Sequence, residues 1–406
     1  MIPDPLPTPA RLAIKVKPSV EKIIRQGHPW VFEKGITKIN KEGKAGDLAI
    51  IFDSKKNQLL ALGLYDPQSV IRIKILSLQK EAIDQQWFDS KIKQAFQKRL
   101  SLFDTDTNAY RLLHGENDGL PGFIADVYHQ VLVIKLYSAI WIPYLQAILK
   151  SLVAVSKCSV AILRLNRQLQ KNPQQLYGYQ EGQLLLGSLP NDNIHFKEHG
   201  VQFCANVRKG HKTGFFLDHR HNRKRVGELA AQKKVLDVFA YAGGFSVHAM
   251  AGGATTVTSL DISAPALALA EQNMGLNFPN APHQTLVADA FQGMAQLYQE
   301  GKRFDLIIVD PPSFAKKESE VERALYQYAR LAKAAVKLVT DEGILLLASC
   351  SSRVTKDQFY ATVLQSVQEM PIKWEEIERS EHDVDHPIGF KEGAYLKSIY
   401  IKMETF

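Results

Sequence analysis

The sequence predicts an α/β protein whose C-terminal half forms a mostly parallel, doubly wound sheet. From Val235 onward, short apolar segments alternate with helical patterns. This alternation is typical of βα units and of a Rossmann-like sheet with helices on both faces. The expected strands are VLDVFA, TVTSLDI, HQTLVAD, FDLIIVD, GILLLAS and YLKSIYIKM. Because 406 residues are many for one core, two or three domains are expected.

Two smaller domains are expected before this sheet. Residues 1–78 contain short strands such as RLAIKV and SVIRIKILS between turn residues, which predicts a β-barrel module. Residues 79–194 predict a central α+β domain, and the remainder, 195–406, contains the doubly wound sheet. The elements expected in the central domain are a helix near 81–102, strands within 110–137, a helix near 141–155, a strand at 160–165 and a loop or hairpin over 166–190.

The charge distribution indicates a polyanionic partner. The chain has 50 Lys and Arg against 42 Asp and Glu, a net charge of +8. Residues 1–75 hold 13 basic against 7 acidic side chains, and residues 205–234 hold 9 against 2. Such concentrations favour nucleic-acid binding over two solvated faces without a partner.

The remaining composition points to a cytoplasmic protein. The longest apolar run, 343–348, has the length of a strand, and the N-terminal segment has prolines where a secretion signal needs apolar residues. Cys158, Cys204 and Cys350 have no CxxC spacing, so neither a zinc site nor a disulfide framework is expected. A reducing compartment, in which a free thiol persists, is therefore expected.

The turn after the first strand of the predicted sheet favours a cofactor without a pyrophosphate. Asp237 lies within this strand, and Gly243 and Gly244 form the turn into a helix that begins near Phe245. Ligands of such sheets bind beyond the carboxyl ends of the strands. The dinucleotide pattern GxGxxG is missing here. S-adenosylmethionine suits such a turn, because it has no phosphate and because a carboxylate can bind its cationic amino group.

Acidic residues also end the next two strands. Asp261 follows Asp237 by 24 positions (261−237), where an acid can accept hydrogen bonds from both ribose hydroxyls. Asp289 ends the third strand, where it could accept a hydrogen bond from an adenine amino group. A single acid would more often be a surface residue, but three at successive strand ends predict a binding site for a nucleoside.

The fourth and fifth strands end in residues that predict methyl transfer, to a nucleobase or an amide from the Asp-Pro-Pro motif and to a base once Cys350 is included. Asp310 precedes two prolines that fix an extended loop, and Cys350 follows 40 positions later (350−310) at the same edge. A free cysteine is usually core filling, but at this edge we expect a nucleophile. A thiolate that adds to C6 of cytosine makes C5 able to accept a methyl group. Arg353 and the tract 205–234 are expected to provide the positive field that favours the thiolate.

The motifs VLDVFAYAGGF, DPPSFAKK and LASCSS, in this order, resemble those of the large-subunit ribosomal RNA cytosine-5 methyltransferases. These enzymes join a PUA domain to a class I methyltransferase domain, and the resemblance covers nearly the whole chain. KPSVEKIIRQGHPWVFEKGI resembles their RNA-binding PUA barrel, and ENDGLPGFIADVY resembles their central domain. KTGFFLDHRHNR resembles their lead-in to the methyltransferase core, and residues 385–397 resemble their C-terminal strand pair.

The resemblance implies a role for each site residue. Cys350 would be the nucleophile that attacks a cytidine of 23S rRNA, and Asp310 would contact the base. Asp218 and Arg220 would lie near the cofactor or the RNA. Ser313 stands where many other RNA cytosine-5 enzymes have a second cysteine, which agrees with this subgroup. The implied S-adenosylmethionine site consists of Asp237, Tyr241, Gly243, Gly244, Phe245, Asp261, Asp289 and Asp310.

Other functions remain open on the sequence alone. A base N-methyltransferase, for example one acting on guanine N7, could share the DPPSF loop and would not need Cys350. A non-catalytic RNA-binding factor in ribosome assembly could retain the fold. A nicotinamide oxidoreductase is disfavoured by the missing pyrophosphate glycines. The sequence leaves open which cytidine is modified, whether naked RNA or a particle is the substrate, and whether the protein is a monomer or a homodimer.

Overall fold

The structure, a computed structural model, describes residues 6–404, which form two compact units. The chain passes from one unit to the other several times. The first unit contains the chain up to 196 together with 205–217 and 384–391, and the second contains 197–204, 218–383 and the residues from 392 onward.

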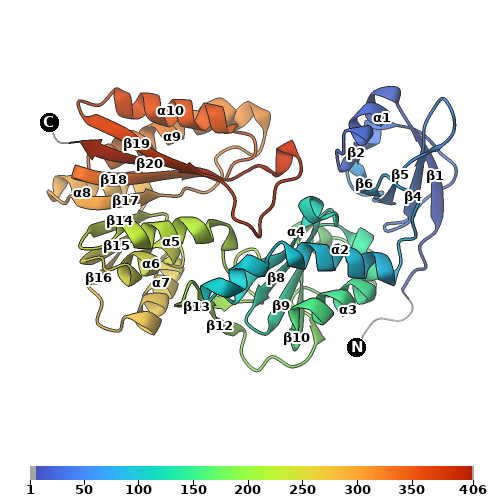
Figure 1. Ribbon diagram of the computed structural model, residues 1–406, viewed down its shortest axis with the longest axis horizontal. Helices are drawn as coiled ribbons and strands as arrows, with labels where there is room; N and C mark the ends of the chain where they lie inside the picture. Colours follow the sequence, from blue (N-terminus) through green and yellow to red (C-terminus); the bar gives the residue numbers. More distant parts are fainter. Residues whose placement is uncertain (1–5, 405–406) are drawn as a thin grey trace. The chain divides into compact units, whose positions relative to one another are not determined.

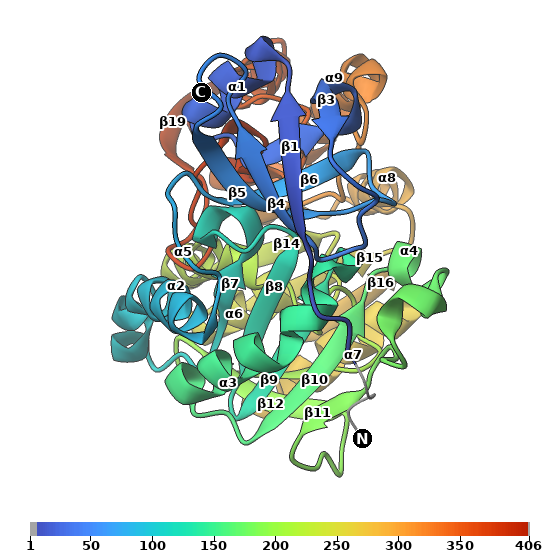
Figure 2. The same ribbon diagram turned by 90° about the vertical axis from the view of Figure 1, so that its right-hand side faces the viewer.

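A six-stranded sheet forms the N-terminal part of the first unit (Figure 2). Its strand order is β2-β6-β5-β4-β1-β3, and only β1 and β4 pair in parallel. Leu12, Ile14 and Val16 alternate along β1 and are buried, so this strand has one face toward the core. The elements are β1 (Arg11–Val16), α1 (Pro18–Arg25), β2 (Trp30–Phe32), β3 (Ile36–Ile39), β4 (Leu48–Phe52), β5 (Leu59–Tyr65) and β6 (Ile71–Ser77). The expected N-terminal β module is present.

A five-stranded sheet forms the other part of the first unit, with the order β11-β10-β9-β8-β7 (Figure 2). The expected helix near 81–102 is shorter and is followed by a 3-10 helix, Leu100–Thr105. The region 166–190 contains two short helices and one short strand. The elements are α2 (Gln85–Gln97), β7 (Ala109–His114), β8 (Phe123–Tyr128), β9 (Val131–Leu136), α3 (Leu145–Ser156), β10 (Val160–Leu165), α4 (Arg167–Gln170) and β11 (Leu184–Leu186), and the pair β12 (Asn193–Glu198) and β13 (Val201–Asn206) follows.

The segment Ala139–Ser156 corrects the expectation that no apolar run has the length of a membrane span. By length and composition its 18 residues, with a mean hydropathy of 1.4, could cross a membrane. Half of the segment is buried inside the structure. Ile140, Trp141 and Leu145 are fully buried in the core beside the five-stranded sheet. Packing in this core accounts for the apolar character of the segment.

Residues 384–391, here called the strap, belong to the first unit although the residues on both sides of them belong to the second. Asp385 is fully buried, and its Oδ2 accepts a hydrogen bond from the backbone N–H of Arg111 at 2.8 Å. Its carbonyl oxygen accepts one from Arg99 Nη2 at 3.0 Å, while Nη1 of Arg99 donates to Asp118 at 3.1 Å. Buried charges need such partners, so the strap completes the interior of the first unit.

The second unit contains a seven-stranded sheet in the order β16-β15-β14-β17-β18-β20-β19. All neighbours are parallel except β20, which is antiparallel to both of its partners. The strands are β14 (Lys234–Val238), β15 (Thr256–Asp261), β16 (His283–Val287), β17 (Phe304–Val309), β18 (Val339–Ser349), β19 (Lys373–Ser380) and β20 (Lys397–Glu404).

Helices cover both faces of this sheet, which confirms the predicted doubly wound α/β class (Figure 1). One face carries α5 (Arg220–Leu229), α6 (Gly244–Ala251) and α7 (Ala264–Asn277). The other carries α8 (Ala290–Gln299), α9 (Val321–Val336) and α10 (Lys356–Gln368).

Two details at the C-terminal end differ from the prediction. The strand β19 was not expected, because its sequence KWEEIERS is mostly polar and partly exposed at the edge of the sheet. The strand pair expected at 385–397 is wrong: this segment holds the strap and a short 3-10 helix, Lys391–Gly393, and β20 begins only at Lys397.

Candidate active site

Asp237 in β14 is 1% exposed, and only one of its two carboxylate oxygens is paired. Its Oδ2 accepts hydrogen bonds from the backbone N–H of Ser246 at 3.1 Å and from the Ser246 hydroxyl at 2.7 Å. Its Oδ1 has no hydrogen-bond partner within residues 6–404. Burial raises the pKa of Asp237 to about 7, with a contribution from the charges of Asp310 and Asp261 and against the effect of Ser246. A buried unpaired oxygen is costly, so Oδ1 marks a position for a ligand that donates hydrogen bonds.

The turn between β14 and α6 adopts unusual backbone angles. Phe239, Tyr241 and Gly243 all have positive φ, at 67°, 48° and 73°. A Cβ on Gly243 would lie 2.8 Å from the Cβ of Ala270, so only glycine fits there. Positive φ at non-glycine residues is uncommon and concentrates at functional sites. The turn therefore has the features of a binding loop beside Asp237.

We expect Gly243→Ala to lower the free energy of unfolding by about 2–4 kcal/mol, the sum of left-handed strain and overpacking. The control is Gly275→Ala in α7, where a new Cβ meets nothing within 4 Å. This change should raise the free energy of unfolding by up to about 1 kcal/mol, because alanine favours helix. Urea unfolding measures both values, and equal effects of the two substitutions would contradict the role given to Gly243.

Asp261 and Asp289 lie at and just beyond the carboxyl ends of the next two strands. Asp261 ends β15 and accepts backbone hydrogen bonds from Tyr241 and Ser263, each at 2.9 Å. Asp289 is exposed and caps α8, where its Oδ1 accepts two backbone N–H groups. Both carboxylates have further lone pairs for a ligand. Because β14, β15 and β16 are parallel neighbours, the structure places the three predicted acids along one edge of the sheet.

Asp310 and Cys350 lie at the same edge, as predicted. They directly follow the parallel neighbours β17 and β18, in which Val309 pairs with Leu347. The Cys350 thiol donates to the carbonyl oxygen of Pro311 at 3.7 Å. Cys350 is partly exposed, and the Asp310 side chain is 24% exposed. The thiol therefore lies against the Asp-Pro-Pro loop, in a residue that is partly exposed.

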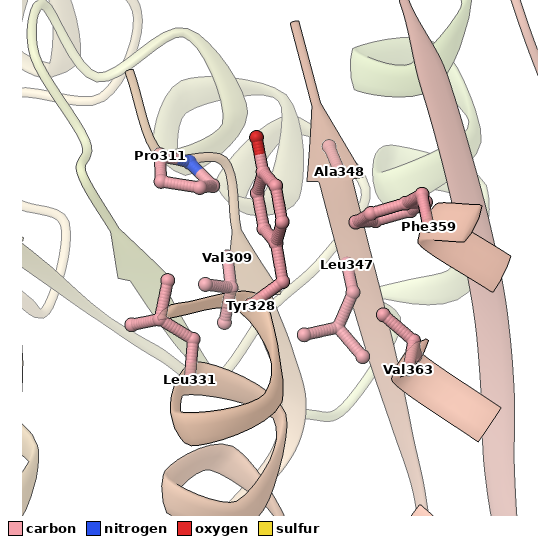
Figure 3. A pocket seen from close by; sticks show the side chains of 8 residues that line it. All are labelled: Val309, Pro311, Tyr328, Leu331, Leu347, Ala348, Phe359 and Val363. Carbon is pink, nitrogen blue, oxygen red and sulfur yellow. The ribbon is translucent and has the colours of Figure 1, made fainter. Parts of the chain in front are cut away.

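Tyr328 in α9 contacts this edge of the sheet through Ser349, and its position was not predicted from the sequence. It is one of eight side chains that line a small, mostly apolar hollow between β17, β18, α9 and α10 (Figure 3). Figure 3 shows its hydroxyl pointing between Pro311 and Ala348. The hydroxyl accepts a hydrogen bond from Ser349 at 2.8 Å. Burial raises the pKa of Tyr328 far above its usual value, so the hydroxyl stays neutral beside Cys350.

His219, immediately before α5, is a second neighbour that the sequence-based prediction lacks. It is 4% exposed, and its Nδ1 lies 3.0 Å from the amide nitrogen of Asn222. The amide oxygen of Asn222 accepts hydrogen bonds from the hydroxyls of Ser380 and Tyr400, so the amide nitrogen is the donor to Nδ1. The ring proton therefore belongs on Nε2, which lies 3.3 Å from Asp310 Oδ1. The two atoms are not aligned for a hydrogen bond, so the contact is electrostatic.

The tract 205–234 does not form the continuous basic surface that its composition suggests. Arg220 is fully buried and pairs with Asp383 at 2.9 Å. Arg223 is 3% exposed and pairs with Glu198 at 2.6 Å. These arginines therefore serve the interior of the second unit. The exposed lysines of the tract are Lys209, Lys212, Lys224 and Lys234.

The structure also describes the surroundings of two other predicted residues, Asp218 and Arg353. Asp218 is 4% exposed and accepts a hydrogen bond from the Tyr395 hydroxyl at 2.9 Å. Arg353, expected to provide a positive field for Cys350, is exposed. The buried cation next to Cys350 is Lys397, which is 2% exposed. A lysine inside a strand pattern gives no local signal of such a position.

The doubly wound sheet, the acids at the ends of β14, β15 and β16, and the turn without GxGxxG define the class of S-adenosylmethionine-dependent methyltransferases. The family of S-adenosylmethionine-dependent methyltransferases matches residues 110–398, and a PUA-like domain family matches residues 14–78. The chain belongs to this methyltransferase family, with a PUA-like domain in its N-terminal part, and its cofactor is S-adenosylmethionine.

Relatives of the chain are similar to it over nearly its whole length. A ribosomal RNA large subunit methyltransferase of Deinococcus radiodurans is 40% identical, covering 98% of this chain and 99% of the relative. The ribosomal RNA large subunit methyltransferase I of Shewanella frigidimarina is 34% identical, covering 97% and 99%. The enzyme of the same name from Alteromonas mediterranea is 32% identical, covering 95% and 97%.

Solved structures share the fold at lower identity. A structure described as a SAM-dependent methyltransferase from Streptococcus mutans has a TM-score of 0.80 at 21% identity and covers 96% of this chain and 99% of that one. A structure described as a methyltransferase complexed with SAH has a TM-score of 0.82 at 21% identity and covers 97% of this chain and 100% of that one.

The residues of the site fit S-adenosylmethionine. The unpaired Oδ1 of Asp237 can accept hydrogen bonds from an ammonium group, and the turn with Gly243 leaves no room for a side chain. Carboxylates rather than phosphate-binding groups line this edge of the sheet. Such a donor set suits a ligand that has an amino group and ribose hydroxyls but no phosphate.

Proposed function

We propose that this protein methylates C5 of a cytidine in 23S ribosomal RNA, with Cys350 as the nucleophile. The observation that carries the proposal is the position of the Cys350 thiol, 3.7 Å from the carbonyl oxygen of Pro311 and beside the Asp-Pro-Pro loop. The names of the relatives, which are ribosomal RNA large subunit methyltransferases, support the choice of RNA. Methyl transfer to a ring nitrogen would leave this thiol without a role in the reaction.

In the proposed reaction the thiolate of Cys350 first adds to the base and is later released from it. Its addition to C6 of the base forms an S–C6 bond and makes C5 nucleophilic. Bound S-adenosylmethionine supplies an electrophilic methyl group. After C5 is methylated, loss of the C5 proton to a base returns the electron pair that breaks the S–C6 bond and releases the thiolate. Asp310 would orient the base by hydrogen bonding, and His219 would keep the Asp310 carboxylate in place. The cytidine must be unpaired or flipped out of its helix to reach the thiol.

In our proposal each cofactor-binding residue contacts a particular part of S-adenosylmethionine. Asp237 would bind the amino group through Oδ1. Asp261 would accept the ribose hydroxyls, and Asp289 would accept the adenine amino group. Gly243 and Gly244 would allow close approach of the backbone to the methionine part. The other residues assigned to this site are Tyr241, Phe245 and Asp310.

RNA binding would use the PUA-like domain and the exposed lysines. The three domains of this proposal keep the boundaries 1–78, 79–194 and 195–406. Phosphate contacts by exposed lysines make affinity fall with rising salt. We place the activity in the cytoplasm.

Trapping of a covalent adduct tests the proposal. RNA that contains 5-fluorocytidine cannot lose a C5 proton, so the S–C6 bond should persist on a denaturing gel after incubation with S-adenosylmethionine. We expect an adduct with the native protein and with Cys204→Ala, whose replaced cysteine is 1% exposed in β13, but none with Cys350→Ala. Bisulfite mapping of 23S rRNA should show one 5-methylcytosine lost in a deletion strain. Absence of both results would refute the cytosine assignment.

A further inference from the structure

Lys397 has a buried ammonium group. Its contacts involve the residues on both sides of Cys350 in the sequence. It is 2% exposed and pairs across the sheet with Ser349, the residue before Cys350. Its Nζ donates to the carbonyl oxygen of Ser351, the residue after Cys350, and to that of Val354 at 2.6 Å. A third hydrogen bond goes to the carbonyl oxygen of Tyr395 at 3.2 Å.

The charge of Lys397 lacks a carboxylate partner. None of the ion pairs among residues 6–404 includes it, although its three N–H donors are satisfied by carbonyl groups. Carbonyl oxygens stabilise an ammonium group without neutralising it. Burial lowers the pKa of Lys397 to about 8, while the thiolate of Cys350 and the carboxylate of Glu381 raise it. At neutral pH the side chain is therefore mainly charged.

Other ionisable groups lie around Cys350 and Lys397. Asp310 lies beyond β17, and its negative charge opposes formation of a thiolate. Tyr328 in α9 interacts electrostatically with both Cys350 and Asp310 but is neutral. Glu381, beyond β19, is exposed and pairs with Lys356 at 3.0 Å. His219 is close to Asp310, and Arg353 is exposed. Lys397 is thus the buried positive charge next to Cys350.

We propose that Lys397 stabilises the thiolate of Cys350 and fixes the loop that presents it. Lys397 contacts neither cofactor nor RNA in this proposal, so it is a positioning residue that acts through Cys350. A positive charge near a cysteine favours the thiolate, and the contacts with the carbonyl oxygens of Ser351 and Val354 keep this charge beside residues 349–354. The inference rests on the proposed function of Cys350 as a nucleophile.

Alkylation of Cys350 at a series of pH values tests the proposal. The rate with iodoacetamide is measured by mass spectrometry of the peptide that contains Cys350, and Cys158 and Cys204 are buried. In Lys397→Met we expect the midpoint of the pH profile to rise by about one unit, so that the rate at pH 7 falls about tenfold. Lys397→Arg, which keeps the charge, should recover most of the shift. A loss of loop geometry alone would not move the midpoint.

The matched control is Lys402→Met on the same strand, a partly exposed lysine paired with Glu342 at 2.6 Å. Its profile should equal that of the native protein. An unshifted midpoint in Lys397→Met, an equal shift in Lys402→Met, or no recovery with Lys397→Arg would each overturn the proposal.

A second measurement leaves Lys397 in place, in case its replacement prevents folding. In Cys350→Ala the pKa of Lys397, followed by NMR of labelled lysine, should fall because the thiolate is gone, and an unchanged value overturns the proposal. Neither experiment contains RNA. These measurements can therefore disprove the role of Lys397 without bearing on the cytosine mechanism. The adduct experiment tests that mechanism separately.

Discussion

Cys350→Ala is expected to lower the rate of methyl transfer at least about 10⁴-fold, because without the thiolate C5 of cytosine is a poor nucleophile toward the methyl group. Binding of S-adenosylmethionine should change less than about twofold, since the acids proposed to bind it belong to other strands or follow them. Single-turnover transfer of a labelled methyl group, with calorimetry of cofactor binding, measures both quantities. Retention of both would mean that the thiol takes no part in the reaction.

The matched control is Cys204→Ala in the same unit. Cys204 is 1% exposed, and its backbone N–H donates to Asn273 rather than to any residue near Cys350. This variant should lose about 1 kcal/mol of stability at most by loss of packing and keep its activity. If Cys350→Ala retains more than a few per cent of the activity of Cys204→Ala, the substrate atom is a ring nitrogen and our mechanism is wrong.

Affinity for S-adenosylmethionine is expected to fall about tenfold per pH unit below pH 7. The reason is Asp237, whose pKa burial raises to about 7, whereas a bound ammonium group requires the ionised carboxylate. Binding should therefore release about half a proton at pH 7 and nearly a whole one at pH 6. Calorimetry in buffers of different ionisation enthalpy measures this release. Binding without proton release would show that the amino group does not meet Asp237.

The variant Asp237→Asn separates binding from stability. It should bind the cofactor weakly at every pH from 5.5 to 7, without the slope of the native protein. The native carboxyl group has a raised pKa, so its contribution to stability is present at acidic pH and is lost as pH rises from about 4 through 7. Asp237→Asn should therefore stabilise the unliganded protein at pH 8 by roughly 1–3 kcal/mol and much less at pH 5. A destabilised variant at pH 8 would contradict this account.

Most strands of the second unit were predictable, because each is a short apolar run followed by an acid or a small residue. The period and spacing of these runs required βα units. The strand β19 was not predictable in this way. Its side chains are partly exposed at an edge, and its pairing comes from β20, not from its own hydrophobicity. The boundaries of the three domains stay a prediction.

The acids and Cys350 were predictable because residues at strand ends converge in a parallel sheet. His219 and Lys397 were not, because they reach this edge from the residue before α5 and from β20, outside the βα units that end in Asp310 and Cys350. Tyr328 reaches it from within α9, between β17 and β18. A tyrosine at a helical core spacing and a lysine within a strand carry no local sign of their neighbours. For the basic tract 205–234, composition suggested an exposed basic surface. Arg220 of this tract is instead buried in an ion pair, which composition cannot show.

The strap has a consequence for the order in which the protein matures during translation. Asp385 in the strap supplies partners to Arg99 and Arg111, which are synthesised almost three hundred residues earlier. Domains generally fold as the ribosome releases them, from the N-terminus onward. Here the first unit lacks one acceptor for the Arg99 guanidinium and one for the backbone N–H of Arg111 until the strap has been made. A nascent chain stalled before the strap would present an unfinished first unit to chaperones and proteases.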